Sequence, residues 1–183
     1  ISGTAKEGET LTAANTLADV DGLGTIAYGW KRAGTAISGA TSSTYELVQA
    51  DVGSAISVTA SYTDGQGTAE RVSSSATSAV ANVNDAPTGS VTISGTAKEG
   101  ETLTAANTLA DADGLGTITN QWKRAGAAIS GATSSTYELG QADVGSEMSV
   151  TASYTDGQGT AESVSSTATS AVANVNDAPT GSV

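Results

Sequence analysis

The chain has 183 residues, no cysteine and no histidine, and its 19 acidic and 7 basic residues give a net charge of −12. The missing thiols exclude disulfides and thiolate metal sites, and the missing imidazole excludes a Ser-His-Asp triad and the commonest zinc ligand. The negative charge repels nucleic acid and anionic membrane surfaces but attracts dissolved cations. No apolar run approaches the ~20 residues that span a bilayer. We therefore expect no enzymatic activity, no nucleic-acid partner, no membrane insertion and no small-molecule substrate.

The sequence consists of two copies of one 92-residue repeat. Residues 1–9 (ISGTAKEGE) return as residues 93–101, and 81 of the 91 aligned positions are identical. A period of this length corresponds to a whole domain rather than to a solenoid unit. We expect the chain to be an excerpt of a longer array. The expected organisation is a first repeat at 1–84, a linker at 85–88, a second repeat at 89–176, and the start of the next linker and repeat at 177–183.

The sequence of each repeat predicts a series of short strands. The clearest is Ala55–Thr63, where Ile56, Val58 and Ala60 alternate with hydroxyl-bearing residues. Asp64-Gly65 follows, and this dipeptide is typical of a tight hairpin turn. About seven short strands and few helix signals in about 92 residues predict an all-β fold built as a β-sandwich. The other expected strands are Ile1–Ala5, Thr10–Ala14, one containing Ile26, Tyr28 and Trp30, Thr44–Leu47, and a return strand from about Thr68 to Val83.

Five short motifs carry a resemblance to a known family. They are Trp30-Lys31-Arg32, residues 37–41 (ISGAT), residues 50–53 (ADVG), residues 62–65 (YTDG) and residues 82–87 (NVNDAP). With these motifs, both repeats resemble the bacterial immunoglobulin-like repeats of large RTX-family surface adhesins that Gram-negative bacteria export by type I secretion. The resemblance implies two tandem immunoglobulin-like β-sandwich domains without a disulfide, each with a buried Trp. It also implies an extracellular location and a role as extender (stalk) repeats that project a distal ligand-binding region.

Acidic residues are expected to gather at the junction between the repeats. In an immunoglobulin-like topology, the loop after the second strand and the last hairpin turn lie at the same pole as the incoming linker. Oxygen ligands without thiol or imidazole suit Ca²⁺. The predicted inter-repeat site comprises Glu7, Asn84, Asp85, Asp111, Asp113 and Asp156. Equivalent half-sites are predicted from Asp19, Asp21 and Asp64 in the first repeat, and from Glu99, Asn176 and Asp177 at the other end.

The linker itself supports this hypothesis. Residues 83–87 (VNDAP) resemble the calcium-binding linker of cadherins, although the second Asn of that pattern is missing. The resemblance implies that an ion between tandem domains stiffens a joint that would otherwise bend. We expect the adjacent repeats of the same polypeptide to be the main partners and the protein to be monomeric. Residues 180–183 repeat the start of a strand, so head-to-tail contacts between molecules are expected at high concentration.

Several alternatives remain open from the sequence. Asp-x-Asp-Gly is also a common turn, because Asp bonds its own backbone and Gly supplies unusual dihedral angles. Trp30 and Trp122 could form a sugar-stacking platform, and the outward Ser/Thr rows could bind a glycan or an ice lattice. Lys6 with Asn82 or Asn84 could form an isopeptide crosslink. The main functional alternative is a repeated carbohydrate- or cell-surface-binding module.

Overall fold

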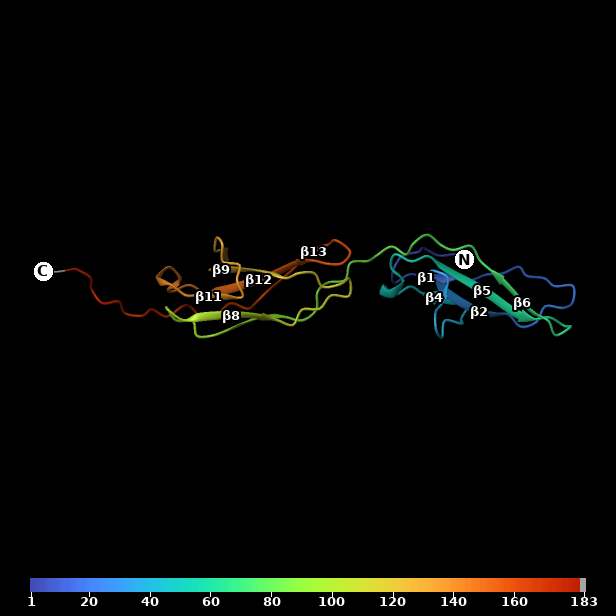
Figure 1. Cartoon of the computed structure of the whole chain (residues 1–183), viewed down its shortest axis with the longest axis horizontal. Helices are drawn as coiled ribbons and strands as arrows, with labels where there is room; N and C mark the ends of the chain where they lie inside the picture. The colour runs from blue at the N-terminus through green and yellow to red at the C-terminus, as the bar shows by residue number, and fades with distance from the viewer. Residues whose placement is uncertain (182–183) are drawn as a thin grey trace. The chain divides into compact units, whose positions relative to one another are not determined.

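The computed structural model of the protein describes residues 1–181, whose regular structure is almost entirely β-strand (Figure 1). The chain divides into two compact units, the first comprising Ile1–Val83 and the second starting at Asn84. The structure thus has the predicted all-β fold, with antiparallel sheets in each unit. Of the predicted segment 177–183, residues 182 and 183 lie outside the described part of the chain.

The second unit contains two antiparallel sheets. One has the strand order β11-β8-β7 and the other β10-β9-β12-β13. Val91 and Leu103 from the first sheet pack in one core with Trp122 and Val150 from the second, as a β-sandwich requires. The strands are β7 (Val91–Ser94), β8 (Thr102–Asn107), β9 (Thr119–Arg124), β10 (Ala127–Ala128), β11 (Thr136–Glu138), β12 (Met148–Thr155) and β13 (Ala161–Ser165), with a short 3₁₀ helix η2 at Gln141–Asp143.

The first unit repeats this arrangement with a shorter first sheet. Its four-stranded sheet has the order β3-β2-β5-β6, while only β1 and β4 form the other sheet. The expected first strand, Ile1–Ala5, is reduced to a single bridge between Ser2 and Thr12. The strands are β1 (Thr10–Thr12), β2 (Ala27–Arg32), β3 (Thr35–Ala36), β4 (Thr44–Glu46), β5 (Ile56–Thr63) and β6 (Ala69–Ser73), with the 3₁₀ helix η1 at Gln49–Asp51.

One tryptophan lies at the centre of each core. Trp30 and Trp122 are fully buried, and each indole N–H donates to a backbone carbonyl, that of Ser42 at 2.8 Å and that of Ser134 at 2.9 Å respectively. The ring of Trp30 also stacks on Tyr45, with 5.7 Å between centroids. A buried indole with a satisfied N–H is a packing residue. The tryptophans therefore cannot serve as a sugar-stacking platform.

A buried aspartate links the two sheets in each unit. Asp143, 1% exposed, accepts hydrogen bonds from Arg124 Nε at 2.6 Å, from the Tyr137 hydroxyl, and from the Gly140 backbone N–H at 2.8 Å. The hydrogen bond that Arg124 donates to Asp143 raises the pKa of Arg124. In the first unit Asp51 occupies the equivalent position and pairs with Arg32 at 2.7 Å. The Asp-Val-Gly motif thus provides a structural anchor, because its carboxylate points into the core.

The long return strand expected from about Thr68 to Val83 is interrupted. β6 ends at Ser73, and the chain bulges between Ser74 and Thr77, whose hydroxyls accept the backbone N–H groups of Val58 and Ile56 at 3.1 and 3.0 Å. In the second unit Ser166 and Thr169 do the same for Val150 and Met148. Side-chain hydroxyl oxygens therefore accept hydrogen bonds that backbone carbonyls accept in a regular β-ladder. The alternation of apolar and polar residues along a strand does not predict this exchange.

Replacing Thr169 by valine should destabilise the second unit by about 1–3 kcal/mol, because the buried backbone N–H of Met148 loses its acceptor. The shape of the side chain is retained, so packing changes little. Guanidinium unfolding followed by Trp122 fluorescence measures the effect. Thr167→Val, at an exposed position of the same segment, is the matched control and should change stability by less than about 0.5 kcal/mol.

Candidate metal centre in the second unit

The candidate centre begins with the loop that connects β8 to β9. Asp111 Oδ1 accepts the backbone N–H of Asp113 at 2.9 Å, and the backbone carbonyl of Asp111 accepts the N–H of Gly114 at 3.2 Å. Asp readily forms such turns because its carboxylate reaches the backbone two residues further on. The turn brings the side chains of Asp111 and Asp113 to one end of the sandwich.

The hairpin between β12 and β13 brings the third carboxylate. Asp156 Oδ1 accepts the backbone N–H groups of Gln158 at 2.9 Å and Thr160 at 2.7 Å, which fixes the side chain in the turn. Gly157 donates its N–H to the Asp113 carbonyl at 3.1 Å, and a Cβ at Gly157 would lie only 2.5 Å from that oxygen. Glycine is therefore required for the hairpin to pack against the Asp111–Gly114 loop.

The three aspartates converge closely enough to share one cation. One carboxylate oxygen from each of Asp111, Asp113 and Asp156 lies within 4.8 Å of the other two. Asp113 is 4% and Asp156 6% exposed, and Asp156 Oδ2 is buried without a hydrogen-bond partner among the described residues. A buried carboxylate oxygen without a partner is costly unless it is compensated. A bound cation would compensate it, so these residues fit a metal ion.

The segment that leads into the second unit contributes to the same place. The backbone N–H of Asp85 donates to Asp113 Oδ2 at 2.8 Å, and Asn84 Nδ2 donates to Glu162 Oε1 at 2.8 Å. A carboxylate oxygen of Asp85 also lies within 4.8 Å of one from Asp113. The structure thus brings Asp111, Asp113 and Asp156 together and places Asp85 next to Asp113, while Asn84 bonds to Glu162. Glu162 was missed by the sequence analysis, since nothing in its strand marks it as a contact of Asn84.

Tyr154 is a second residue that the sequence did not identify. Its hydroxyl donates to Asp111 Oδ2 at 2.5 Å, so both oxygens of Asp111 are held. Burial of the ring, and then the hydrogen bond to Asp111, raise the pKa of Tyr154 above its ordinary value. Tyr154 lies two residues before Asp156 on the strand that enters the turn, which is the one sequence signal that could have indicated it.

The raised pKa of Tyr154 predicts alkaline instability of the second unit. A hydroxyl whose pKa is higher in the folded than in the unfolded state stabilises the fold below its unfolded pKa of about 10, and this contribution is lost as the pH rises above that value. The free energy of unfolding should therefore fall above about pH 10. Tyr154→Phe should make this fall less steep in urea unfolding measured across the alkaline range. An unchanged slope in the variant would contradict the assignment to Tyr154.

The first unit contains the same loop and turn but a different environment. Asp21 N–H donates to Asp19 Oδ1 at 2.9 Å, Tyr62 donates to Asp19 Oδ2 at 2.8 Å, and Asp64 Oδ1 accepts the N–H of Thr68 at 2.7 Å. Asp21, however, is exposed, whereas its counterpart Asp113 is buried. Within residues 1–181 these three aspartates do not form a close carboxylate group.

The remaining predicted ligands form hydrogen bonds within their own units. Glu7, in the first unit, accepts the backbone N–H of Val83 at 3.3 Å, and Glu99, in the second, accepts that of Val175 at 3.0 Å. Asn176 Nδ2 donates to the backbone carbonyl of Asp177 at 3.3 Å. The inter-repeat role of Glu7 and the half-site of Glu99, Asn176 and Asp177 stay predictions.

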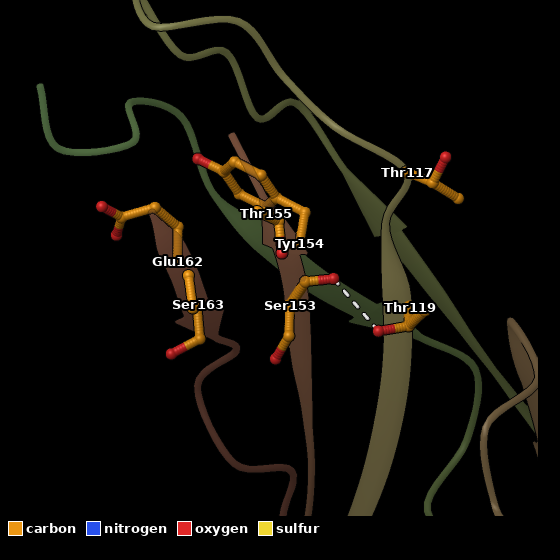
Figure 2. A pocket seen from close by; sticks show the side chains of 8 residues that line it. Thr117, Thr119, Ser153, Tyr154, Thr155, Glu162 and Ser163 are labelled. Atoms are coloured by element: carbon orange, nitrogen blue, oxygen red, sulfur yellow. Dashed lines mark hydrogen bonds between the residues drawn. The ribbon is translucent and has the colours of Figure 1, made fainter. Parts of the chain in front are cut away.

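A shallow hollow of about 440 Å³ lies on the outer face of the second unit, where β9, β12 and β13 run side by side (Figure 2). Figure 2 shows Thr119, Ser153 and Ser163 from these three strands, with the Thr119 hydroxyl donating to the Ser153 carbonyl at 3.1 Å. Equivalent residues of the first unit line a hollow of about 310 Å³. Hydroxyl-bearing residues line both hollows, and all tyrosines and tryptophans of the chain are buried or half-buried.

Residues 1–181 contain no helix that is long and apolar enough to cross a membrane. Comparison of the chain with protein-family models and with curated proteins found no match.

Proposed function

We propose that these repeats are extender domains of a large bacterial surface adhesin, and that Ca²⁺ bound at the aspartate centre stiffens the joint before each repeat. The observation that carries this proposal is Asp156 Oδ2, a buried carboxylate oxygen that lacks a partner next to Asp111 and Asp113. Its surroundings supply only oxygen ligands. Ca²⁺ accepts six to eight oxygens in flexible geometry, whereas thiols and imidazoles favour softer metals.

The position of the centre in the chain supports a role in the joint. Asn84 directly follows Val83, the last residue of the first unit, and both Asn84 and Asp85 bond to the second unit. A cation held by Asp85, Asp111, Asp113 and Asp156 would fix the linker on the second unit. Without a cation, the carboxylates repel one another, so the linker detaches more readily and the joint bends.

The expected affinity fits an extracellular role. Calcium sites in extracellular modules have dissociation constants of about 10⁻⁴–10⁻³ M. At a free concentration about 100-fold above that constant, the ion would stabilise the ordered joint by about 2.7 kcal/mol. Near-identical tandem repeats suit a spacer, because each added copy lengthens the array and presents nearly the same residues. The proposal also includes an extracellular location, the adjacent repeats as partners and no catalytic activity.

Small-angle X-ray scattering in Ca²⁺ and in EDTA tests the proposed function. We expect a larger and better-defined maximum dimension in Ca²⁺, and a broader distribution of distances in EDTA. Asp85→Ala keeps the backbone hydrogen bond to Asp113 but removes the carboxylate, so its scattering in Ca²⁺ should approach that of the wild type in EDTA. Glu101→Ala, at an exposed position, is the control. Identical profiles in Ca²⁺ and EDTA would refute the stiffening role.

A repeated glycan-binding module is the second candidate, favoured by the equivalent hollows with hydroxyl-bearing residues in both units. Hydroxyls of Thr119, Ser153 and Ser163 could bond a sugar, and Glu162 adds a carboxylate. Sugar sites gain much of their affinity from an exposed aromatic ring, which these hollows lack. A glycan array with the Ser153→Val variant as control distinguishes the candidates, since the extender function predicts no glycan bound through this face.

A further inference from the structure

The ring and the hydroxyl of Tyr154 have separate roles. The ring is buried in the core of the second unit together with Val150 and Ala152, which precede it on the same face of β12. A phenylalanine ring would fill this volume equally well. The hydroxyl extends from the packed ring and donates to Asp111 Oδ2 at 2.5 Å. The hydroxyl therefore contributes to the aspartate centre rather than to the packing of the core.

This hydrogen bond fixes the orientation of one carboxylate of the centre. Asp111 Oδ1 accepts the backbone N–H of Asp113 at 2.9 Å, while Oδ2 accepts the hydroxyl of Tyr154. With a donor on each oxygen, the carboxylate cannot rotate without breaking a hydrogen bond. A carboxylate has about four lone-pair positions, so Asp111 keeps lone pairs for a cation. Hydrogen bonds that orient a ligand carboxylate in this way raise metal affinity.

The first unit shows that this pair forms without a close group of carboxylates. Tyr62 donates to Asp19 Oδ2 at 2.8 Å, and Asp19 Oδ1 accepts the backbone N–H of Asp21 at 2.9 Å. Within residues 1–181, however, Asp19, Asp21 and Asp64 do not form such a group. The hydrogen bond between tyrosine and aspartate is thus a property of the folded unit. In the second unit it can orient Asp111 before a cation binds.

The neighbour of Tyr154 on the next strand explains why a neutral donor is suited to this position. Tyr154 pairs in register with Glu162 on β13, so both side chains lie on the same face of the sheet (Figure 2). Glu162 Oε1 accepts Asn84 Nδ2 at 2.8 Å. A side chain that only accepts hydrogen bonds would face the carboxylates of Asp111 and Glu162 without a donor between them. The phenol supplies that donor and adds no negative charge.

We propose that Tyr154 is a positioning residue of the aspartate centre, whose hydroxyl holds Asp111 in the orientation that binds a divalent cation. The ion contacts the aspartates, and Tyr154 acts on it through Asp111. The inference rests on the proposed function for the identity of the ion, Ca²⁺, but it does not require that the ion stiffens the joint. Removal of the hydroxyl should therefore weaken binding of the ion while the ring still fills the core.

A Ca²⁺ titration of the full chain, followed by the amide NMR signals of Asp113 and Gln158, tests the proposal. Tyr154→Phe should raise the dissociation constant at least about tenfold, as is typical when an outer hydrogen bond to a ligand is lost. Tyr62→Phe removes the equivalent hydroxyl of the first unit and should change the constant less than about twofold. Incorporation of 4-aminophenylalanine at position 154 restores a donor at the end of the ring and should recover most of the affinity.

Urea unfolding in EDTA separates positioning from stability. A Tyr154→Phe protein that is less stable in EDTA but binds Ca²⁺ with an unchanged dissociation constant would overturn the proposal, since the hydroxyl would then serve the fold alone. Equal weakening by Tyr62→Phe would overturn it too, because the effect would not come from Asp111. No saturable binding by the wild type would refute the calcium centre itself. Identical scattering profiles in Ca²⁺ and EDTA would refute only the stiffening of the joint.

Discussion

Replacing Asp143 by alanine should lower the free energy of unfolding of the second unit by about 3 kcal/mol. The carboxylate is 1% exposed and accepts hydrogen bonds from Arg124, Tyr137 and the backbone N–H of Gly140. Its removal leaves a hydroxyl and an amide without an acceptor in a buried place, and it also creates a cavity. Arg124 keeps partial access to water, with a side chain 33% exposed, which limits the loss.

Guanidinium unfolding can isolate this effect, because each unit contains one buried tryptophan. The Asp143→Ala protein should show an earlier transition that carries only the Trp122 part of the fluorescence change. Asp51→Ala is the matched variant in the first unit and should shift the Trp30 part instead. Glu138→Ala, at an exposed position near Tyr137, is the control. A loss below about 1 kcal/mol for Asp143→Ala would show that the buried carboxylate is not an anchor.

Asp156→Asn should act in opposite directions with and without calcium. The amide oxygen can still accept the N–H groups of Gln158 and Thr160, so the turn is retained. Without calcium, the variant removes one of three carboxylates whose oxygens lie within 4.8 Å of one another, and stability should rise by about 1 kcal/mol. At saturating Ca²⁺ the wild type should gain about 2.7 kcal/mol that the variant lacks.

Opposite effects of Asp156→Asn in EDTA and in Ca²⁺ would identify Asp156 as a calcium ligand. Replacing a purely structural aspartate would lower the stability of the unit under both conditions. Urea unfolding in Ca²⁺ and in EDTA measures it. Asp64→Asn changes the equivalent turn of the first unit and is the matched control, because its carboxylate does not belong to a close group within residues 1–181. Destabilisation of Asp156→Asn in EDTA would contradict the account.

Much of the fold follows from the sequence alone. The alternation at Ala55–Thr63, the turn at Asp64-Gly65 and the 92-residue period were sufficient to predict repeated β-sandwiches. The buried role of Asp143 could not be predicted, because the partner that neutralises it, Arg124, lies 19 residues away on another strand. A charged residue followed by Val-Gly is typical of a surface turn, and the sequence does not show that Asp143 pairs with Arg124.

The candidate site was also predicted only in part. Asp111, Asp113 and Asp156 were predicted from turn patterns and from the positions of loops at one pole, and they do converge. Tyr154 was not predicted, because its hydrogen bond to Asp111 spans 43 residues. The different exposure of Asp21 and Asp113 also escaped prediction. Their local sequences are nearly identical, and the hydrogen bond that Asp113 accepts from the backbone of Asp85 joins residues 28 positions apart, which the loop sequence does not show.

Calorimetric titration of the full chain with Ca²⁺, with Asp156→Asn beside it, tests the central claim most directly. We predict saturable binding with a dissociation constant of about 10⁻⁴–10⁻³ M, weakened at least tenfold by the substitution and little changed by Asp64→Asn. The absence of saturable binding, or binding that Asp156→Asn leaves unchanged, would contradict the claim that the aspartates of the second unit hold calcium.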